Sequence, residues 1–421
     1  WGAYRNMDID KNGVPLDRPL ISNLLQDAGY TCGMVGKWHV GPKDETLRKE
    51  VLSKKAAADV SLQNRLRDAG YTSSTGKGFH PLDRGFDYYF GFNSHGDLYY
   101  ESETLWEGRE RVVKRPAGEF LTNLLNTKAV DFARGAMEEG KPFFLYYAPK
   151  TLHGGILPPP ERYSSQFDTG VSFTDGYAGH LLALDEGIET LYAALRAQGQ
   201  LENTLFLFSS DNGCTRYNVP PYNAPNRGGK GSGWLGGSNV PLIIHQPGVV
   251  ASGESNALAS LADIMPTVLE TAGLSSPTGI DGKSLLPILS GKEKNVRHSL
   301  TLSGLHSSGW SWLYEANGEV NKKDRADAPL FVCSIGENDR VLLQLSDIPA
   351  GLYENLPDGV PPRTLLYDLA TDRHQLTDLS WSYPEEIERL NAGLHEWLKG
   401  MEVPKTSQQE DYEYLMEATR N

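Results

Sequence analysis

Largely apolar runs and helical apolar stripes alternate along the first two thirds of the chain. Apolar runs at residues 30–35, 143–148, 205–208 and 240–245 predict strands. Before, between and after these runs, apolar residues recur every three or four positions, which predicts helices at 19–28, 121–137, 181–195 and 263–271. Because strands and helices alternate, we expect an α/β fold with a mostly parallel sheet sandwiched by helices.

The pattern changes after a segment rich in glycine, serine and proline at 273–291. An amphipathic stretch at 382–399 predicts one helix, and short apolar runs separated by turn residues predict strands at 297–302, 330–335, 340–345 and 364–369. This pattern predicts a smaller C-terminal α+β domain of antiparallel strands and one helix. We therefore expect two domains, 1–291 and 292–421, which suits a chain longer than a single core of roughly 250–300 residues.

The apolar run at 205–208 ends abruptly in Ser209, Ser210, Asp211, Asn212 and Gly213. Apolar residues on both faces of a strand imply layers above and below it, as around a buried parallel strand. In open α/β sheets, ligands bind beyond the carboxyl ends of the strands. Because carboxylate and amide oxygens suit hard cations such as calcium or magnesium, Asp211 and Asn212 are candidate metal ligands. The alternative is that Asp-Asn-Gly forms only a turn.

The acidic composition restricts the partners that the protein can have. A net charge of −14 and a pI near 5.2 argue against nucleic acid and anionic membranes, which bind basic surfaces. An acidic protein with an anionic substrate must concentrate its cations locally. The three cysteines, Cys32, Cys214 and Cys333, show no disulfide framework or zinc spacing, and no apolar run in the sequence is long enough to span a membrane.

Basic and proton-transferring side chains follow the predicted strands. Lys37 and His39 follow the first strand, His153 follows the strand at 143–148, and Lys230 lies in a glycine-rich loop. Two lysines, two histidines and a candidate cation site suit a protein that holds an anion and moves protons beside it. Taken singly, each residue could equally be a surface lysine or a loop histidine.

Several short motifs occur in one order along nearly the whole chain. They are Gly-Lys-Trp-His at 36–39, Arg-Gly-Phe-Asp at 84–87, Ala-Pro-x-x-x-His at 148–153, Ser-Asp-Asn-Gly at 210–213, Gly229-Lys230 followed by Gly236-Gly237 and Val240-Pro241, Asp263-Ile-Met-Pro-Thr, Asp281-Gly-Lys-Ser-Leu-Leu-Pro and Leu366-Tyr-Asp-Leu. This ordered set resembles the type I, formylglycine-dependent sulfatases of the alkaline phosphatase superfamily. The resemblance implies an alkaline phosphatase-like fold and hydrolysis of sulfate esters with one calcium ion (Ca2+).

The resemblance also assigns roles to individual residues. Six positions match functional residues of the family: Asp211 and Asn212 as calcium ligands, and Lys37, His39, His153 and Lys230 around the sulfate. Lysine suits sulfate because one compact charge serves several oxygens. By the same resemblance, His153 and Lys230 protonate or stabilise the departing alkoxide, and His39 takes a proton from the nucleophile.

Two parts of the family's site are missing from the printed sequence. No Cys/Ser-x-Pro-x-Arg motif, the source of the formylglycine nucleophile, occurs in it, and the paired aspartates of the family's first strand are also absent. By resemblance both belong upstream of Trp1, so we expect an N-terminally truncated chain that is inactive alone. In addition, Leu235 and Asn239 replace a glutamate and an arginine of the family's lysine loop, which leaves the placement of Lys230 less fixed.

Aromatic residues in loops are candidates for contact with a substrate outside the sulfate pocket. We assign His95, Tyr99, Trp234 and Trp310 as candidate substrate-binding residues, although such aromatics can equally belong to the core. The expected partner is a sulfated carbohydrate or another small sulfate ester. The resemblance further implies a periplasmic or extracellular location, with the signal segment not present in this chain.

Two other functions stay open at this point. A phosphodiesterase or phosphonate hydrolase of the same superfamily would share the sheet and the metal strand. The pair Lys37 and His39, together with Lys230, favours a sulfatase over it. A non-catalytic glycan-binding relative would have lost the nucleophile altogether. The reading frame upstream of Trp1 distinguishes such a binder from an active enzyme.

Overall fold

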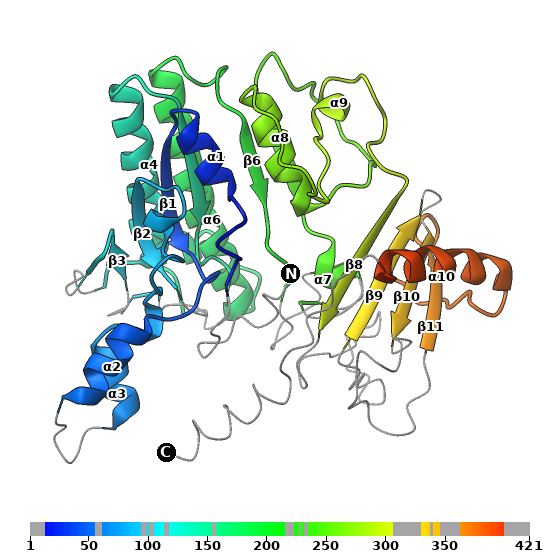
Figure 1. Ribbon diagram of the computed structural model, residues 1–421, viewed down its shortest axis with the longest axis horizontal. Helices are drawn as coiled ribbons and strands as arrows, with labels where there is room; N and C mark the ends of the chain where they lie inside the picture. Colours follow the sequence, from blue (N-terminus) through cyan, green and yellow to red (C-terminus); the bar gives the residue numbers. More distant parts are fainter. Residues whose placement is uncertain are drawn as a thin grey trace. The chain divides into compact units, whose positions relative to one another are not determined.

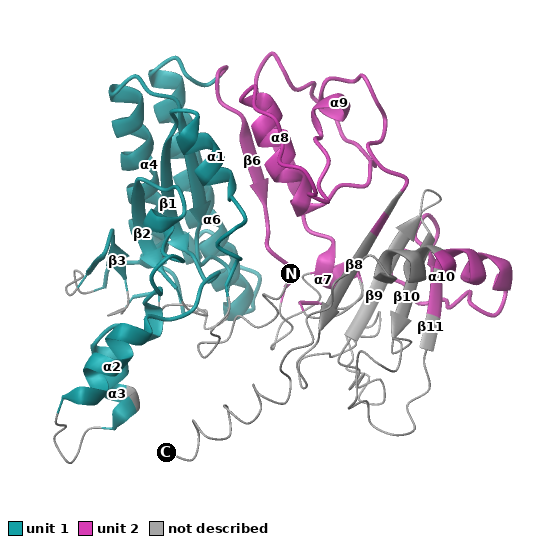
Figure 2. Ribbon diagram, in the orientation of Figure 1, with its two compact units in different colours: residues 1–201, 406–421 teal, residues 202–405 magenta. Residues whose placement is uncertain are grey.

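The structure is a computed structural model of the 421-residue chain. It describes residues 13–54, 61–93, 99–100, 105–112, 118–153, 157–214, 223–226, 229–230, 235–305, 330–336, 340–345 and 363–399 (Figure 1). The chain divides into two compact units, which Figure 2 shows in different colours. Unit 1 comprises Trp1–Leu201 and Thr406–Asn421, and unit 2 comprises Glu202–Lys405.

Unit 1 contains a mixed five-stranded sheet in the order β4-β3-β2-β1-β5. Its strands are β1 (Thr31–Lys37), β2 (Tyr88–Phe92), β3 (Trp106–Glu107), β4 (Glu110–Arg111) and β5 (Phe143–Ala148). The central strand β1 is parallel to both β2 and β5, whereas β3 and β4 add antiparallel pairs at one edge. The carboxyl ends of β1, β2 and β5 therefore lie at the same end of the sheet.

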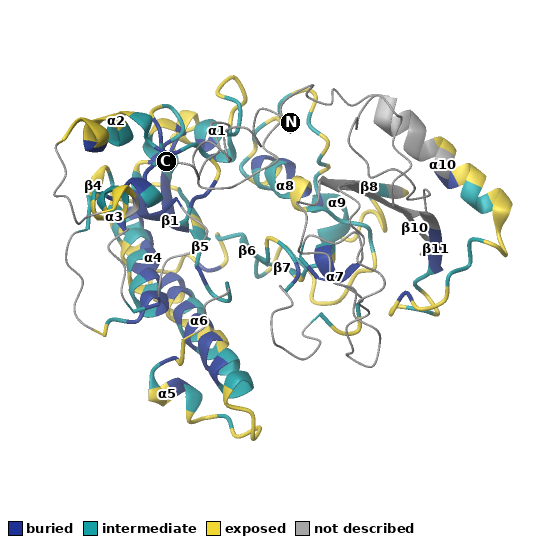
Figure 3. Cartoon of the chain, turned by 90° about the horizontal axis from the view of Figure 1, so that it is seen from below, coloured by how far each residue is buried: buried dark blue, intermediate teal, exposed yellow. Residues whose placement is uncertain are grey.

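The helices of unit 1 fall where apolar periodicity predicts them, with additional short ones. They are α1 (Ile21–Asp27), α2 (Glu45–Ser53), α3 (Leu62–Asp68), α4 (Leu121–Glu138), α5 (Glu161–Ser164) and α6 (Ser172–Ala197), with 3-10 turns η1 (Tyr71–Ser73) and η2 (Pro81–Asp83). Helices α4 and α6 pack side by side (Figure 1), and buried residues line both of them (Figure 3).

Helices α1 and α4 pack against opposite faces of β1. The Cys32 Sγ lies 3.6 Å from the Ser22 carbonyl oxygen of α1, while the next residue, Gly33, lies against the Phe132 ring of α4. This alternation is the two-residue period of a strand covered on both faces. The core on the α4 side consists of Val35, Phe90, Phe92, Leu105, Leu121, Leu125 and Ala129.

The Arg-Gly-Phe-Asp motif anchors this sheet. The Arg84 guanidinium donates hydrogen bonds to backbone carbonyls of the segment 14–18, at 2.8 to 3.2 Å. The Asp87 carboxylate accepts from the Cys32 backbone N–H at 2.8 Å and from the Gln26 side chain at 2.7 Å. The motif therefore fixes the entry into β1 and supports the fold, since its charged groups are used in these backbone and helix contacts.

Unit 2 begins with a two-stranded antiparallel sheet, which corrects one sequence-based expectation. β6 (Phe206–Ser209) pairs with β7 (Leu242–His245), and its residues are half-buried, whereas the apolar run predicts a buried parallel strand. Ser209 lies opposite Leu242, so the chain leaves β6 and enters β7 at the same end of the sheet. A connection of that kind gives antiparallel strands, and an apolar run by itself does not specify the direction of pairing.

The other elements of unit 2 include the predicted C-terminal strands and helix. The elements are α7 (Leu235–Ser238), η3 (Leu261–Asp263), α8 (Ile264–Thr271), α9 (Leu286–Leu289), β8 (Ser299–Leu305), β9 (Leu330–Gly336), β10 (Arg340–Leu345), β11 (Arg363–Asp368) and α10 (Pro384–Lys399). The four strands form an antiparallel sheet in the order β11-β10-β9-β8, and α10 packs on β9 and β10. The domain boundary between 291 and 292 stays a prediction, because the two compact units divide the chain elsewhere.

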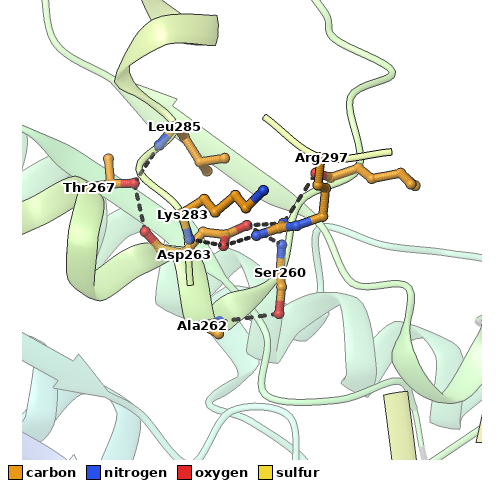
Figure 4. Close-up of polar contacts among 8 residues, drawn as sticks. Ser260, Ala262, Asp263, Thr267, Lys283, Leu285 and Arg297 are labelled. Atoms are coloured by element: carbon orange, nitrogen blue, oxygen red, sulfur yellow. Dashed lines mark hydrogen bonds and ion pairs between the residues drawn. The ribbon is translucent and has the colours of Figure 1, made fainter. Parts of the chain in front are cut away.

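A buried carboxylate, Asp263, joins the beginning of α8 to Arg297 in the segment just before β8 (Figure 4). Its oxygens accept the backbone N–H groups of Ser260 at 2.7 Å and Lys283 at 2.8 Å, and they form a two-nitrogen ion pair with Arg297. Asp263 is fully buried, and the Arg297 side chain is only 7% exposed. The Thr267 hydroxyl adds a hydrogen bond to the Asp263 carbonyl at 2.6 Å. Two of the later sequence motifs thus meet in a structural anchor.

Helix α6 is the longest described helix, with 26 residues. Its sequence carries Asp185, Glu186 and Glu189, so it is amphipathic and not uniformly apolar. Within the described ranges, no helix combines the length and the hydrophobicity that crossing a membrane requires.

Candidate active site

Lys37 and His39 lie at the carboxyl end of β1. Gly36 lies directly opposite Ala148 of β5, and a Cβ atom at Gly36 would collide with the Ala148 carbonyl oxygen. Its φ of 111° also falls in the region that favours glycine. The glycine therefore lets the ends of β1 and β5 approach closely, and this brings the Lys37 segment and the chain that follows β5 to one end of the sheet.

His39 adopts an unusual backbone conformation. Its φ is +46°, a left-handed value that is uncommon for residues other than glycine, and the residue is buried. The neighbouring Trp38 fixes the segment, because its backbone N–H donates to the Phe92 carbonyl and its indole N–H donates to the Phe79 carbonyl, each at 2.9 Å. Backbone strain of this kind persists where the surrounding structure holds it, and it concentrates at functional sites.

His153 lies in a turn that begins just after β5. The His153 backbone N–H donates to the Lys150 carbonyl at 2.7 Å. The turn is attached to α4 by the hydroxyls of Thr151 and Thr122, which lie 2.9 Å apart. Because β5 is parallel to β1, this turn leaves the sheet at the same end as Lys37. Unit 1 thus places Lys37, His39 and the His153 turn at one end of its sheet, as expected for residues that follow parallel strands.

Tyr99 lies beneath the His153 turn and is completely buried. Its hydroxyl donates to the His153 carbonyl at 3.3 Å, and its ring packs on His180 and carries the Lys150 Nζ at 4.5 Å from its centroid. A fully buried ring cannot stack on a sugar in solvent, so the structure does not support Tyr99 as a substrate platform. Tyr99 is buried because it packs with Phe120, Tyr163 and Ala183 in a core cluster. Three further candidates, His95, Trp234 and Trp310, lie outside the described residues.

Asp211 and Asn212 follow β6 in unit 2, as predicted. Asp211 is exposed and Asn212 is half-buried. The Ser210 hydroxyl donates to the Asn212 carbonyl at 3.0 Å, and the Asn212 amide donates to the Gly213 carbonyl at 2.9 Å. Since its amide nitrogen is used inside the turn, the Asn212 side-chain oxygen remains the part that suits a cation.

The segment after Asn212 is tied directly to the lysine loop. The Lys230 backbone N–H donates to the Cys214 carbonyl at 3.2 Å, and the Gly213 N–H donates to the Gly237 carbonyl at 3.0 Å. Asn223 strengthens this connection, because its side-chain oxygen accepts from the Cys214 N–H at 2.8 Å and its amide donates to the Cys214 carbonyl at 3.2 Å. Unit 2 thus holds Lys230 beside the strand end that carries the candidate metal ligands.

Close backbone contacts explain two glycines of this arrangement. A Cβ atom at Gly213 would collide with the Gly236 carbonyl oxygen, and one at Gly229 would meet the Cys214 carbonyl oxygen. The segment 213–214 and the lysine loop can therefore approach each other only because Gly213 and Gly229 lack a side chain. This is a structural reason for the Asp-Asn-Gly and Gly-Lys pairs of the sequence.

Two residues of the site escape sequence reasoning. Asn223 binds the Cys214 backbone and the Lys150 side chain contacts the Tyr99 ring, and such contacts leave no pattern in the chain. The one available signal for Lys150 is its position within Ala-Pro-x-x-x-His, where a buried lysine is unusual. In total, Lys37, His39 and His153 belong to unit 1, and Asp211, Asn212 and Lys230 belong to unit 2.

The described residues offer fewer oxygen donors than a calcium ion needs. Calcium takes six to eight oxygen ligands, typically about seven. Asp211 and Asn212 offer side-chain oxygens, but among the described residues no group of three or more His, Cys, Asp or Glu side chains could hold a metal ion. These donors have the right chemistry for a hard cation and are too few to enclose one.

Neither Cys32 nor Cys214 has the environment of a nucleophile. Burial, with a smaller contribution from the negative charge of Asp87, raises the pKa of the Cys32 thiol to about 12. Burial also raises the pKa of Cys214. A reactive thiol needs a lowered pKa, so both residues are structural.

The sheet of unit 1 has basic and histidine residues at the carboxyl end of its parallel strands, and unit 2 carries Asp211 and Asn212 at a strand end, which is the arrangement of an α/β protein with polar groups at strand ends. The Sulfatase family model matches residues 2–274. The chain belongs to the sulfatase family. Relatives named for a sulfatase activity include N-acetylgalactosamine-6-sulfatase and arylsulfatase A.

Two relatives illustrate the extent of the similarity. An uncharacterized sulfatase of Escherichia coli, YdeN, is 28% identical over 424 residues, which cover 96% of this chain and 70% of the relative. The N-acetylgalactosamine-6-sulfatase of Mus musculus is 30% identical over 340 residues, which cover 74% of this chain. The aligned region spans 58% of the length of the mouse enzyme.

Solved structures share the fold. Ps i-CgsB in complex with k-i-k-neocarrahexaose has a TM-score of 0.72 at 22% identity, covering 99% of this chain and 83% of that chain. BT4656 in complex with its substrate D-glucosamine-2-N,6-O-disulfate has a TM-score of 0.63 at 17% identity, covering 97% of this chain and 86% of that chain. The predicted α/β fold of the alkaline phosphatase superfamily is therefore confirmed.

Proposed function

We propose that the protein hydrolyses the sulfate ester of a sulfated saccharide. The observation that carries the proposal is the common end of β1 and β5 in unit 1, where Lys37, His39 and the His153 turn come together. A lysine and two histidines at one sheet end can hold an anionic group and exchange protons with it. Membership of the sulfatase family supports sulfate as that anion.

Each basic residue has a defined part in the proposed reaction. Lys37 holds the sulfate oxygens, where negative charge is spread. As the bond between sulfur and the leaving oxygen breaks, His153 and Lys230 give that oxygen a proton or stabilise its charge, because an alkoxide leaves poorly near neutral pH. His39 accepts a proton as sulfate is released. The strained backbone of His39 supports a role that needs a fixed position.

We propose calcium as the cation of the site, with Asp211 and Asn212 among its ligands. When bound, a calcium ion supplies positive charge beside the sulfate oxygens. The test is a calcium titration of the chain by calorimetry, with Asp211→Ala as the variant and the exposed Asp168→Ala as control. Loss of a residue that only supports a metal ligand by a hydrogen bond already lowers metal affinity about tenfold or more. Because Asp211 is a proposed ligand itself, Asp211→Ala is expected to weaken calcium binding at least that much. Equal affinities of the wild type and Asp211→Ala contradict the assignment.

A saccharide is the proposed substrate class. The support comes from relatives, because the names of the mouse enzyme and of BT4656 with its substrate refer to sulfated sugars. A phosphonate hydrolase is the second candidate, since the phosphonate monoester hydrolase SpPMH shares the fold with a TM-score of 0.53 at 16% identity. The pair Lys37 and His39 with Lys230 favours the sulfatase.

No Cys or Ser of the 421 residues lies in a Cys/Ser-x-Pro-x-Arg motif, from which a formylglycine nucleophile is made. We therefore propose that the hydrolysis proposed above needs this motif in addition, and that the 421 residues by themselves bind sulfated ligands without releasing sulfate. The test compares sulfate release from an aryl sulfate by the 421-residue polypeptide with that of its Lys230→Ala variant. Equal background rates support the proposal, and a rate of the wild-type polypeptide above the variant overturns it.

We propose a periplasmic or extracellular location, on the basis of the family. Fractionation of the native host, with detection of the protein by antibody, tests it. Recovery in the cytoplasmic fraction contradicts the proposal.

A further inference from the structure

We propose that Tyr99 is a positioning residue for His153, and that Lys150 completes this support by binding the Tyr99 ring. The inference rests on the proposed function, in which the His153 imidazole acts at the leaving oxygen. It gives a role to a buried tyrosine and a buried lysine that do not touch the sulfate in that proposal.

The Tyr99 ring is held rigidly from several sides. It is completely buried and belongs to a cluster with Phe120, Tyr163 and Ala183. Its ring centroid lies 5.8 Å from that of Phe120 in a stacked arrangement and 4.2 Å from that of His180. Its backbone carbonyl accepts the Leu121 N–H at 2.7 Å, which fixes the main chain as well. A ring enclosed in this way holds its hydroxyl in one place.

Tyr99 contacts the His153 turn at both of its ends. The hydroxyl donates to the His153 carbonyl at 3.3 Å, and the ring lies 4.5 Å from the Lys150 Nζ. Within the turn, the Lys150 carbonyl accepts the His153 N–H at 2.7 Å. One aromatic side chain therefore braces the first and last residues of a four-residue turn.

Lys150 is a charged residue in a position that disfavours charge. It is only 5% exposed, and burying an ammonium group costs free energy unless its charge is compensated. An aromatic face offers such compensation to a desolvated cation. Lys150 thus depends on Tyr99 for part of its stabilisation, and the turn depends on Lys150.

The protonation states in the cluster agree with this role. Burial raises the pKa of Tyr99, so its hydroxyl keeps its proton and can donate to the His153 carbonyl. The pKa of His180 is lowered, chiefly by burial and in part by the positive charge of Lys150. A neutral His180 adds no repulsion to the cation beside it.

A proton donor must lie within hydrogen-bond distance of the leaving oxygen, and small displacements are costly. The bond from Tyr99 reaches the backbone of His153 itself, so it limits the movement of the whole residue. The Thr122 contact holds the middle of the turn through Thr151. Tyr99 therefore supports the end of the turn that carries the imidazole.

The test compares Tyr99→Phe with Tyr100→Phe in the 421-residue chain. Tyr99→Phe removes the hydroxyl and keeps the ring beneath Lys150. Tyr100→Phe is a matched control, because the Tyr100 hydroxyl donates to the Pro158 carbonyl at 2.6 Å and not to the turn. Thermal unfolding first checks that both variants fold. NMR then measures the exchange rate of the His153 amide hydrogen and the shift of the His153 imidazole signals on addition of inorganic sulfate.

In Tyr99→Phe, loss of one hydrogen bond is expected to speed exchange of the His153 amide and to weaken the response to sulfate, each by roughly two- to tenfold. Tyr100→Phe is expected to match the wild type in both readouts. Unchanged exchange in Tyr99→Phe overturns the proposal, and so does an unchanged sulfate response. If the wild-type imidazole does not respond to sulfate while Tyr99→Phe still speeds exchange, the proposed function fails and Tyr99 is reduced to a structural support.

Discussion

The Lys230 backbone N–H donates to the Cys214 carbonyl at 3.2 Å, and this bond joins the lysine loop to the strand end with Asp211 and Asn212. Asn223 holds the same Cys214 residue through both its side-chain atoms, at 2.8 and 3.2 Å. Lys230 and the candidate metal ligands of unit 2 are therefore connected through the backbone of Cys214.

Asn223→Ala is expected to weaken binding of inorganic sulfate by about three- to tenfold, because two hydrogen bonds to the Cys214 backbone are lost. Isothermal calorimetry with sulfate measures the effect. Asn203→Ala, at an exposed position after Leu201, serves as the control and is expected to leave sulfate binding unchanged. If Asn223→Ala binds sulfate as the wild type does, the connection through Cys214 does not place Lys230.

Asp263→Asn is expected to lower the free energy of unfolding by about 3–5 kcal/mol, because it leaves the Arg297 charge buried without its partner. Denaturation with urea measures the change. The control is Glu386→Gln, which breaks the ion pair with Arg389, whose side chain is 62% exposed, and is expected to cost at most about 1 kcal/mol. Similar costs for the two variants contradict the structural role of Asp263.

The elements that sequence predicts best have clear boundaries in the chain. The strand predicted at 143–148 coincides with β5, since Pro142 and Pro149 bracket its apolar run, and the helix predicted at 121–137 matches α4 within one residue. Strand β2 is absent from the prediction. Gly91 interrupts its pattern, and its strand conformation depends on pairing with β1, which no local signal records.

The candidate site likewise contains residues that the sequence predicts and a residue whose role depends on the fold. Lys37, His39 and His153 each follow a predicted strand, and parallel strands bring their carboxyl ends together, so a shared sheet end is expected for them. Tyr99 is assigned to the substrate as an aromatic residue in a predicted loop, and the structure buries it. Aromatic residues serve cores and ligands alike, so burial must be known before the role can be assigned.

Cys32 is expected to resist alkylation in the folded protein. It is completely buried, and with a pKa of about 12 only about one thiol in ten thousand is ionised at pH 8. Iodoacetamide treatment followed by mass spectrometry of the Cys32 peptide measures this. The same peptide is expected to react readily in denaturant, and rapid labelling under native conditions would contradict the account.

Stability is expected to fall as the pH is lowered from about 6.5 toward about 4, the pKa to which His80 is lowered by burial and by the charge of Arg109. In that range the unfolded chain binds a proton at His80 and the folded protein does not, so acid favours unfolding. His80→Asn, which can still accept the Leu82 N–H, is expected to reduce this pH dependence of the thermal midpoint.

The exposed His374→Asn provides the comparison and is expected to leave the pH dependence unchanged. His180, whose pKa is also lowered, accounts for part of the remaining slope in His80→Asn. A slope in His80→Asn as steep as that of the wild type shows that His80 does not titrate in this way.

The most direct test of the central claim is the rate of sulfate release from sulfated saccharides by the protein expressed from its complete reading frame, beside a phosphonate monoester and a Lys230→Ala variant. The account predicts that the saccharide sulfate is hydrolysed faster than the phosphonate, and that Lys230→Ala lowers the rate by at least about 100-fold. Faster hydrolysis of the phosphonate, or a Lys230→Ala variant as active as the wild type, would contradict it.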